Sequence, residues 1–170
     1  MRNCTVAACV NSVVGKIHMQ CYFNGFVGDQ IVQFLTTAIN NWSLLVDQET
    51  RNSGCVLILD NCPSHREDVL NEACTVSNTF RKLLAHSPLL NIIENVFNVH
   101  KIYIKRLHNE NRERLMEIDT MQRGEKTRLR LELLHQFCNA GWNLVDNVDI
   151  YNAWVSMFGI LPMCIGLEDL

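Results

Sequence analysis

Short apolar segments separated by turn residues open the chain. Residues 4–10 and 17–23 are two such segments with turn residues between them, and this pattern predicts an antiparallel hairpin. Apolar side chains then recur every three or four residues from Ile31 to Trp42, which predicts an amphipathic helix. The first quarter of the chain therefore predicts two paired strands followed by a helix with one buried face.

The next segment predicts a parallel pair of strands. The polar residues 47–54 are expected to form a loop that leads into the apolar run 55–59, which ends at Asp60. A continuous apolar run of this length is typical of a strand buried on both faces. A helix over 64–74 and a short strand over 78–84 follow, and because a helix connects the two strands we expect them to be parallel.

A long helix that carries Glu94 is predicted to start after the pair Ser87-Pro88. Its apolar face comprises Ile93, Val96, Phe97, His100, Tyr103, Ile104 and Leu107. Its polar face comprises Glu94, Asn98, Lys101, Lys105 and His108. The basic groups of the polar face lead away from Glu94 along the helix.

Helical spacing continues to the C-terminus. Charged residues dominate 109–134, and Gly141 is the expected end of that helical region. A last helix is predicted from Asp149, ending at Gly159 and Pro162. With four strands and several helices, the pattern predicts an α/β fold.

Composition favours a single globular domain. The 170 residues are 48% hydrophobic and 19% charged, values that exclude a disordered chain. The net charge of −3 does not by itself indicate a nucleic-acid-binding protein. However, nine of the fifteen Lys and Arg residues lie between Lys101 and Arg130, together with five acidic residues. This local excess is either a surface that faces phosphates or an ordinary solvated helix face.

The eight cysteines and the absence of long apolar segments bear on the cellular environment. No two cysteines have Cys-x-x-Cys spacing, so we interpret them as buried free thiols rather than as a disulfide or zinc framework. No signal-peptide pattern and no apolar run of membrane-spanning length is present in the sequence. We therefore expect a soluble intracellular protein with no membrane partner.

Two acidic residues are candidate metal ligands. Asp60 follows a predicted strand at the edge where open α/β sheets place their sites, and Glu94 lies in the first turn of a predicted helix. Carboxylates on two rigid elements are what a divalent metal site requires. Considered singly, Asp60 could be a turn or cap residue, and Glu94 could complement the helix dipole.

The residues around these acids resemble the second and third acidic motifs of the DDE transposases of the mariner superfamily. The first motif is the segment LILDNCPSH, and the second is HSPLLNIIENVF. The family pattern is matched by Asp60, Asn61, His65, Ser87, Pro88, Leu90, Asn91, Ile93 and Glu94. It is not matched by Leu84, Ala85 and His86, where the family has Pro-Pro-Tyr, or by Ile92, where it has Pro. The resemblance covers roughly residues 3–110.

The resemblance implies an RNase H-like mixed sheet flanked by helices. Residues 1–110 would be a partial DDE endonuclease domain, and 111–170 a helical C-terminal extension of it. In this family three acids hold two Mg²⁺ (or Mn²⁺) ions that assist DNA strand cleavage and transfer in the nucleus. Asp60 and Glu94 would be the catalytic, metal-binding second and third acids. The expected partner is DNA rather than a small molecule, with a homodimer as a further possibility.

The first acid and the central strand that carries it have no match in this sequence. We therefore expect the 170 residues to be inactive in DNA cleavage. The hairpin and the strand 55–59 should then lack their shared neighbour, leaving two unpaired strand edges and marginal stability.

Two other interpretations remain open. The chain could be a non-catalytic relic of a transposase that binds nucleic acid or protein, with His65, Lys101, Lys105 and Arg106 as candidate DNA contacts. It could also be a helical α/β scaffold in which both acids have structural roles. For His65, capping of the following helix is the alternative to phosphate contact.

Overall fold

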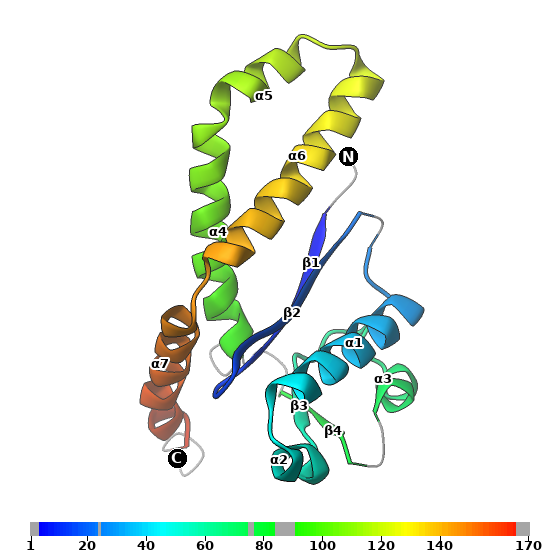
Figure 1. The fold of residues 1–170 in the computed structure, drawn as a ribbon, viewed down its shortest axis with the longest axis vertical. Helices are drawn as coiled ribbons and strands as arrows, with labels where there is room; N and C mark the ends of the chain where they lie inside the picture. Colours follow the sequence, from blue (N-terminus) through cyan, green and yellow to red (C-terminus); the bar gives the residue numbers. More distant parts are fainter. Residues whose placement is uncertain (1–3, 24, 75–76, 84–90, 166–170) are drawn as a thin grey trace.

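The computed structural model describes residues 4–23, 25–74, 77–83 and 91–165. In chain order its elements are β1 (Thr5–Asn11), β2 (Gly15–Tyr22), α1 (Asp29–Leu45), α2 (Gln48–Ser53), β3 (Val56–Leu59), α3 (Glu67–Ala73), β4 (Thr79–Lys82), α4 (Ile92–Glu110), α5 (Arg112–Asp119), α6 (Arg123–Leu144) and α7 (Asn147–Ile165). The fold is mixed α/β, with small sheets flanked by helices (Figure 1). The α/β class expected from the sequence is confirmed.

The strands form two separate sheets rather than one mixed sheet. β1 and β2 pair antiparallel, and β3 and β4 pair parallel, as the sequence predicted. In the described part of the chain, however, neither pair is hydrogen-bonded to the other. The physical reason is that no described strand lies between β1 and β3 to connect them.

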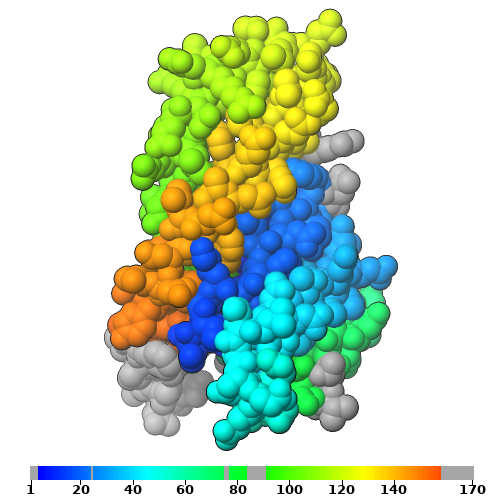
Figure 2. Space-filling model, in the orientation of Figure 1, coloured from blue at the N-terminus to red at the C-terminus, as the bar shows by residue number. Residues whose placement is uncertain are grey.

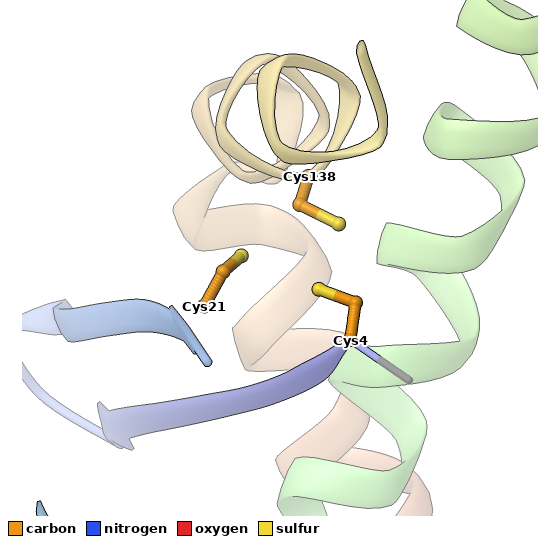
Figure 3. A group of neighbouring side chains, drawn as sticks. All are labelled: Cys4, Cys21 and Cys138. Carbon is orange, nitrogen blue, oxygen red and sulfur yellow. The ribbon is translucent and has the colours of Figure 1, made fainter. Parts of the chain in front are cut away.

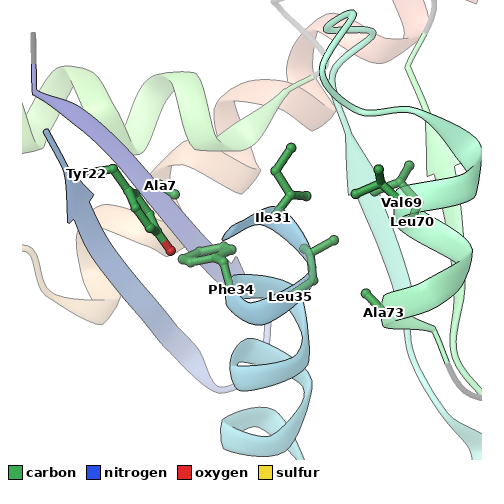
Figure 4. Packing of buried hydrophobic residues seen from close by; sticks show 8 residues of the cluster. All are labelled: Ala7, Tyr22, Ile31, Phe34, Leu35, Val69, Leu70 and Ala73. Carbon is green, nitrogen blue, oxygen red and sulfur yellow. The ribbon is translucent and has the colours of Figure 1, made fainter. Parts of the chain in front are cut away.

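α1 joins the two sheets through apolar contacts. All six buried residues of this helix belong to the apolar stripe that the spacing predicted: Ile31, Phe34, Leu35, Ala38, Ile39 and Trp42. Figure 4 shows the side chains of α1 between the hairpin and α3. On one side they pack with Ala7 and Tyr22, and on the other with Val69, Leu70 and Ala73.

The expectation that β3 is buried on both faces is wrong. Val56 and Ile58 are 60% and 56% exposed, whereas Leu57 and Leu59 pack against the cluster around α1 and α3. A strand is buried on both faces only where elements cover both. Here α1 and α3 provide one apolar surface, so the side chains of the other face remain exposed.

The chain is helical from Ile92 to Ile165, apart from short connections. α4 packs against both α6 and α7, and α5 packs against α6. Buried residues of α4, α6 and α7, including Val96, Trp142 and Ile150, form a second core. The far ends of α4 and α6, with α5, form an arm that extends beyond the sheets, seen in yellow and green in Figure 2.

Gly141 does not end a helix, contrary to the sequence-based expectation. It is buried within α6, where a Cβ atom would lie only 3.2 Å from side-chain atoms of His100 and Ile104 on α4. The glycine therefore permits the close approach of the two helices. The charged region 109–134 is helical, as its spacing predicted, and comprises the end of α4, all of α5 and the first part of α6, with a break at residues 120–122.

Three other element boundaries also differ from the expectations. The segment 47–54 contains the short helix α2, because the Asp47 side chain accepts a hydrogen bond from the Thr50 backbone N–H at 2.8 Å and caps it. α3 begins at Glu67 rather than at residue 64, after a turn closed by a backbone hydrogen bond to the Cys62 carbonyl. α7 does not end at residues 159 and 162 but continues to Ile165. Glycine and proline cost a helix only about 1 and 3 kcal/mol relative to alanine, so they disfavour a helix without excluding it.

No helix in the described residues is both long and apolar enough to cross a membrane.

Candidate functional site

A cleft of about 720 Å³ runs between the two sheets. Every residue of β1 and every residue of β3 lines it. Because residues on one face of a strand alternate, a lining of consecutive residues means that the cleft follows the edges of both strands. The opposite edges are paired with β2 and β4, and no described strand pairs with the edges of β1 and β3 that border the cleft, which are called their free edges below.

Asp60 lines this cleft directly after β3. Its carboxylate Oδ1 is 2.8 Å from His65 Nδ1, and the side chain is 51% exposed. The His65 ring also lies 3.3 Å from the Asp60 carbonyl oxygen, so it bridges the turn that follows the strand. Asp60 is held in position while it remains accessible to water and ions.

His65 does not cap the following helix. α3 has Arg66 at its N-cap position and no side-chain cap. The His65 side chain is instead mostly buried, 16% exposed, and lines the cleft beside Asp60. The capping interpretation is therefore wrong.

Glu94 lines the same cleft from the first turn of α4. The buried residue Asn91 precedes the helix, and its carbonyl oxygen accepts a hydrogen bond from the Glu94 backbone N–H at 3.0 Å. Ile92 is buried and anchors the same turn. The Glu94 side chain is exposed, so both carboxylates are available to the cleft.

The donor set fits a hard divalent cation. Carboxylate oxygens are the protein ligands that Mg²⁺ prefers, and Mg²⁺ commonly binds through one or two carboxylates while keeping several waters. Asp60 and Glu94 could supply these ligands. Among the described residues, these carboxylates do not belong to a cluster of three ligating side chains, so the protein offers two acids rather than a closed cage.

The candidate DNA-binding cations lie away from the cleft. Lys101, Lys105 and Arg106 are exposed along α4 and do not line it. Arg106 Nε is 2.8 Å from Glu110 Oε1, one turn further along α4, so this cation is partly neutralised. Lys101 and Lys105 lie on the exposed polar face that the sequence predicted.

Part of the second motif cannot be placed. Residues 84–90, which include His86, Ser87, Pro88 and Leu90, lie outside the described residues. Of the motif positions that match the family pattern, the structure places Asn91, Ile93 and Glu94 at the cleft.

Sequence analysis missed a cluster of three cysteines. Cys4, Cys21 and Cys138 bring their sulfur atoms to within 4.8 Å of one another. Pairing of Val6 with Cys21 in the hairpin puts Cys4 and Cys21 on the same face as diagonal neighbours, which the predicted hairpin could have indicated. Nothing in the spacing indicated Cys138.

Comparisons of this chain with family models, curated proteins and solved structures returned no match. The resemblance to mariner-type transposases accordingly depends on the two motifs.

Proposed function

We propose that this chain is a DDE endonuclease-like domain related to the mariner transposases. In this proposal Asp60 and Glu94 bind a divalent cation beside the phosphate backbone of DNA. The observation that carries the proposal is that the two acids of the two motifs line one cleft, although they come from different elements.

The arrangement of the strands supports the proposal. An antiparallel hairpin, a helix and a strand ending in an acid are the order that an RNase H-like fold would have after its first strand. The free edges of β1 and β3 border the same cleft, where a shared neighbouring strand would pair with both.

Each residue has a defined task in this function. Asp60 and Glu94 supply oxygen ligands, and His65 orients the Asp60 carboxylate through the 2.8 Å contact. A bound Mg²⁺ would supply charge stabilisation for displacement at phosphorus. Because only two carboxylates line the cleft among the described residues, we expect the chain to bind the cation weakly and leave DNA uncut.

Metal binding is tested with Mn²⁺, whose free fraction is followed by electron paramagnetic resonance. Asp60→Asn and Glu94→Gln should each weaken Mn²⁺ binding by about tenfold or more. Glu72→Gln is the matched control, because Glu72 is an exposed acid on α3 outside the cleft. Unchanged affinity in Asp60→Asn would show that the acids have structural roles only.

The absence of cleavage is tested separately. Supercoiled plasmid incubated with the chain and Mg²⁺ or Mn²⁺ should remain uncut. Metal-dependent nicking that disappears in Asp60→Ala would overturn the inactivity while supporting the metal site.

A second function is favoured by the charge of the helical arm. Nine Lys and Arg residues lie between Lys101 and Arg130, on α4, α5 and α6. Three of the nine pair with carboxylates, namely Arg106, Arg128 and Arg130. The remaining cations could bind duplex DNA without cutting it. Affinity should then fall steeply between about 50 and 200 mM salt, and a flat response would exclude this function.

A further inference from the structure

Three cysteines from three separate elements converge at the end of the hairpin remote from its turn. Cys4 directly precedes β1, Cys21 is in β2, and Cys138 is in α6. Figure 3 shows the three side chains pointing toward one another. Their sulfur atoms all lie within 4.8 Å of one another. The three cysteines are distant from one another in sequence, so it is the fold that brings them together.

The surrounding structure holds the third cysteine against the hairpin. Cys138 is 2% exposed, and its carbonyl oxygen lies 2.8 Å from Nε2 of the buried His100. At the other end of the hairpin, Lys16 Nζ donates a hydrogen bond to the Trp142 carbonyl oxygen at 3.0 Å. α6 is therefore held by α4 at Cys138 and by the hairpin at Trp142, one helical turn beyond the cluster.

The separation of the sulfurs matches a metal site closely. With a Zn–S distance of about 2.3 Å and tetrahedral angles, sulfur ligands lie about 3.8 Å apart. The observed limit of 4.8 Å requires the sulfurs to close by at most about 1 Å. Rotation about the Cα–Cβ bond of the partly exposed Cys4 and Cys21 can provide this.

The thiols also influence each other's ionisation. Hydrogen bonding from Cys138, reinforced by Cys4, lowers the pKa of Cys21 to about 7. The hydrogen bond to Cys21 and burial raise the pKa of Cys138, and burial together with the charge of Cys21 raises that of Cys4.

We propose that Cys4, Cys21 and Cys138 form a three-thiolate binding site for a soft d¹⁰ metal ion, Cu⁺ or Zn²⁺. Thiolates select these ions over hard cations such as Mg²⁺. In the described residues no fourth His, Cys, Asp or Glu joins the group. Three sulfurs complete a trigonal Cu⁺ site, whereas Zn²⁺ would take a water as its fourth ligand. The bound ion would tie the start of β1, the end of β2 and α6 together.

The site is tested on the full, reduced chain under anaerobic conditions. Zn²⁺ and Cu⁺ are titrated separately against chromophoric chelators, and we expect one ion per chain. Cys21→Ser should weaken binding by more than about 100-fold. Cys4→Ser is the second variant, because this partly exposed residue precedes the first strand and its substitution should leave the fold intact. Cys74→Ser, a partly exposed cysteine outside the cluster, is the matched control and should bind as the wild type does.

X-ray absorption then distinguishes the two ions. Three sulfurs alone around Cu⁺, or three sulfurs and one oxygen around Zn²⁺, would each support the site, and chelator competition identifies the ion that binds tighter. The proposal is overturned if neither ion binds at one per chain. It is also overturned if binding survives Cys4→Ser or is lost equally in Cys74→Ser.

Discussion

Replacing Gly141 with alanine should have two opposing effects on stability: it raises the helix propensity of α6, but it brings a new Cβ atom too close to α4. Alanine is about 1 kcal/mol more favourable than glycine inside a helix. At this position, however, the new Cβ would lie 3.2 Å from His100 Cδ2, 3.2 Å from Ile104 Cγ1 and 3.3 Å from His100 Nε2. These distances are shorter than ordinary van der Waals contacts, so the neighbours have to move.

A shift of His100 would destabilise the folded state. It is 2% exposed, and its Nε2 is 2.8 Å from the Cys138 carbonyl oxygen. Overpacking typically costs about 1–3 kcal/mol, and a buried polar group deprived of its partner costs about 1–3 kcal/mol. After the propensity gain is subtracted from these two costs together, Gly141→Ala should lower the free energy of unfolding by about 1–5 kcal/mol.

Urea unfolding monitored by tryptophan fluorescence measures this change. With an m-value of about 2 kcal/mol/M, the midpoint should fall by about 0.5–2.5 M. Gly124→Ala is the matched control, since Gly124 lies in the first turn of the same helix with no atom near its Cβ position. The control should be stabilised by about 0.5 kcal/mol. If Gly141→Ala raises the midpoint as Gly124→Ala does, the close packing of α4 and α6 inferred here is wrong.

Three further predictions concern stability. Burial lowers the folded-state pKa of His100 and His18 below 6.5, so the unfolded chain binds more protons than the folded chain in mildly acidic solution. The free energy of unfolding should therefore decrease as pH falls below about 6.5. A free energy of unfolding that is the same at neutral and mildly acidic pH would contradict this. Leu70→Ala removes a fully buried side chain between α1 and α3 and should cost about 2–5 kcal/mol, whereas Val13→Ala, at an 87% exposed position, should change the free energy of unfolding by less than about 0.5 kcal/mol. The two unpaired strand edges should keep the free energy of unfolding of the wild type below about 5 kcal/mol, and a cooperative urea transition well above that value would contradict the expectation of marginal stability.

Local patterns predicted what depends on local spacing. The buried stripe from Ile31 to Trp42 follows from helical periodicity alone, and the hairpin follows from two apolar runs around a turn. The parallel pairing of β3 and β4 follows from the helix between them. In each case the residues that determine the structure are neighbours in sequence.

Long-range packing decided the features that the sequence did not indicate. The exposure of Val56 depends on which elements cover β3, and the role of Gly141 depends on a contact with α4. The meeting of Cys138 with the hairpin depends on where α6 crosses it. For the candidate site, the motifs identified Asp60 and Glu94 as a pair, but the cleft between the strand edges and the contact of His65 with Asp60 required the structure.

The division of the sheet has a consequence for amide hydrogen exchange. A continuous sheet would link β1 and β3 by backbone hydrogen bonds, so that neither could open alone. Here α1 couples the hairpin to α3 through side-chain contacts instead. The segment from α2 to β4 can therefore detach as a cooperative unit while α4, α6 and α7 stay folded around their own core. Amide protons of β3 should exchange through this partial opening, well before those in the buried turns of α6.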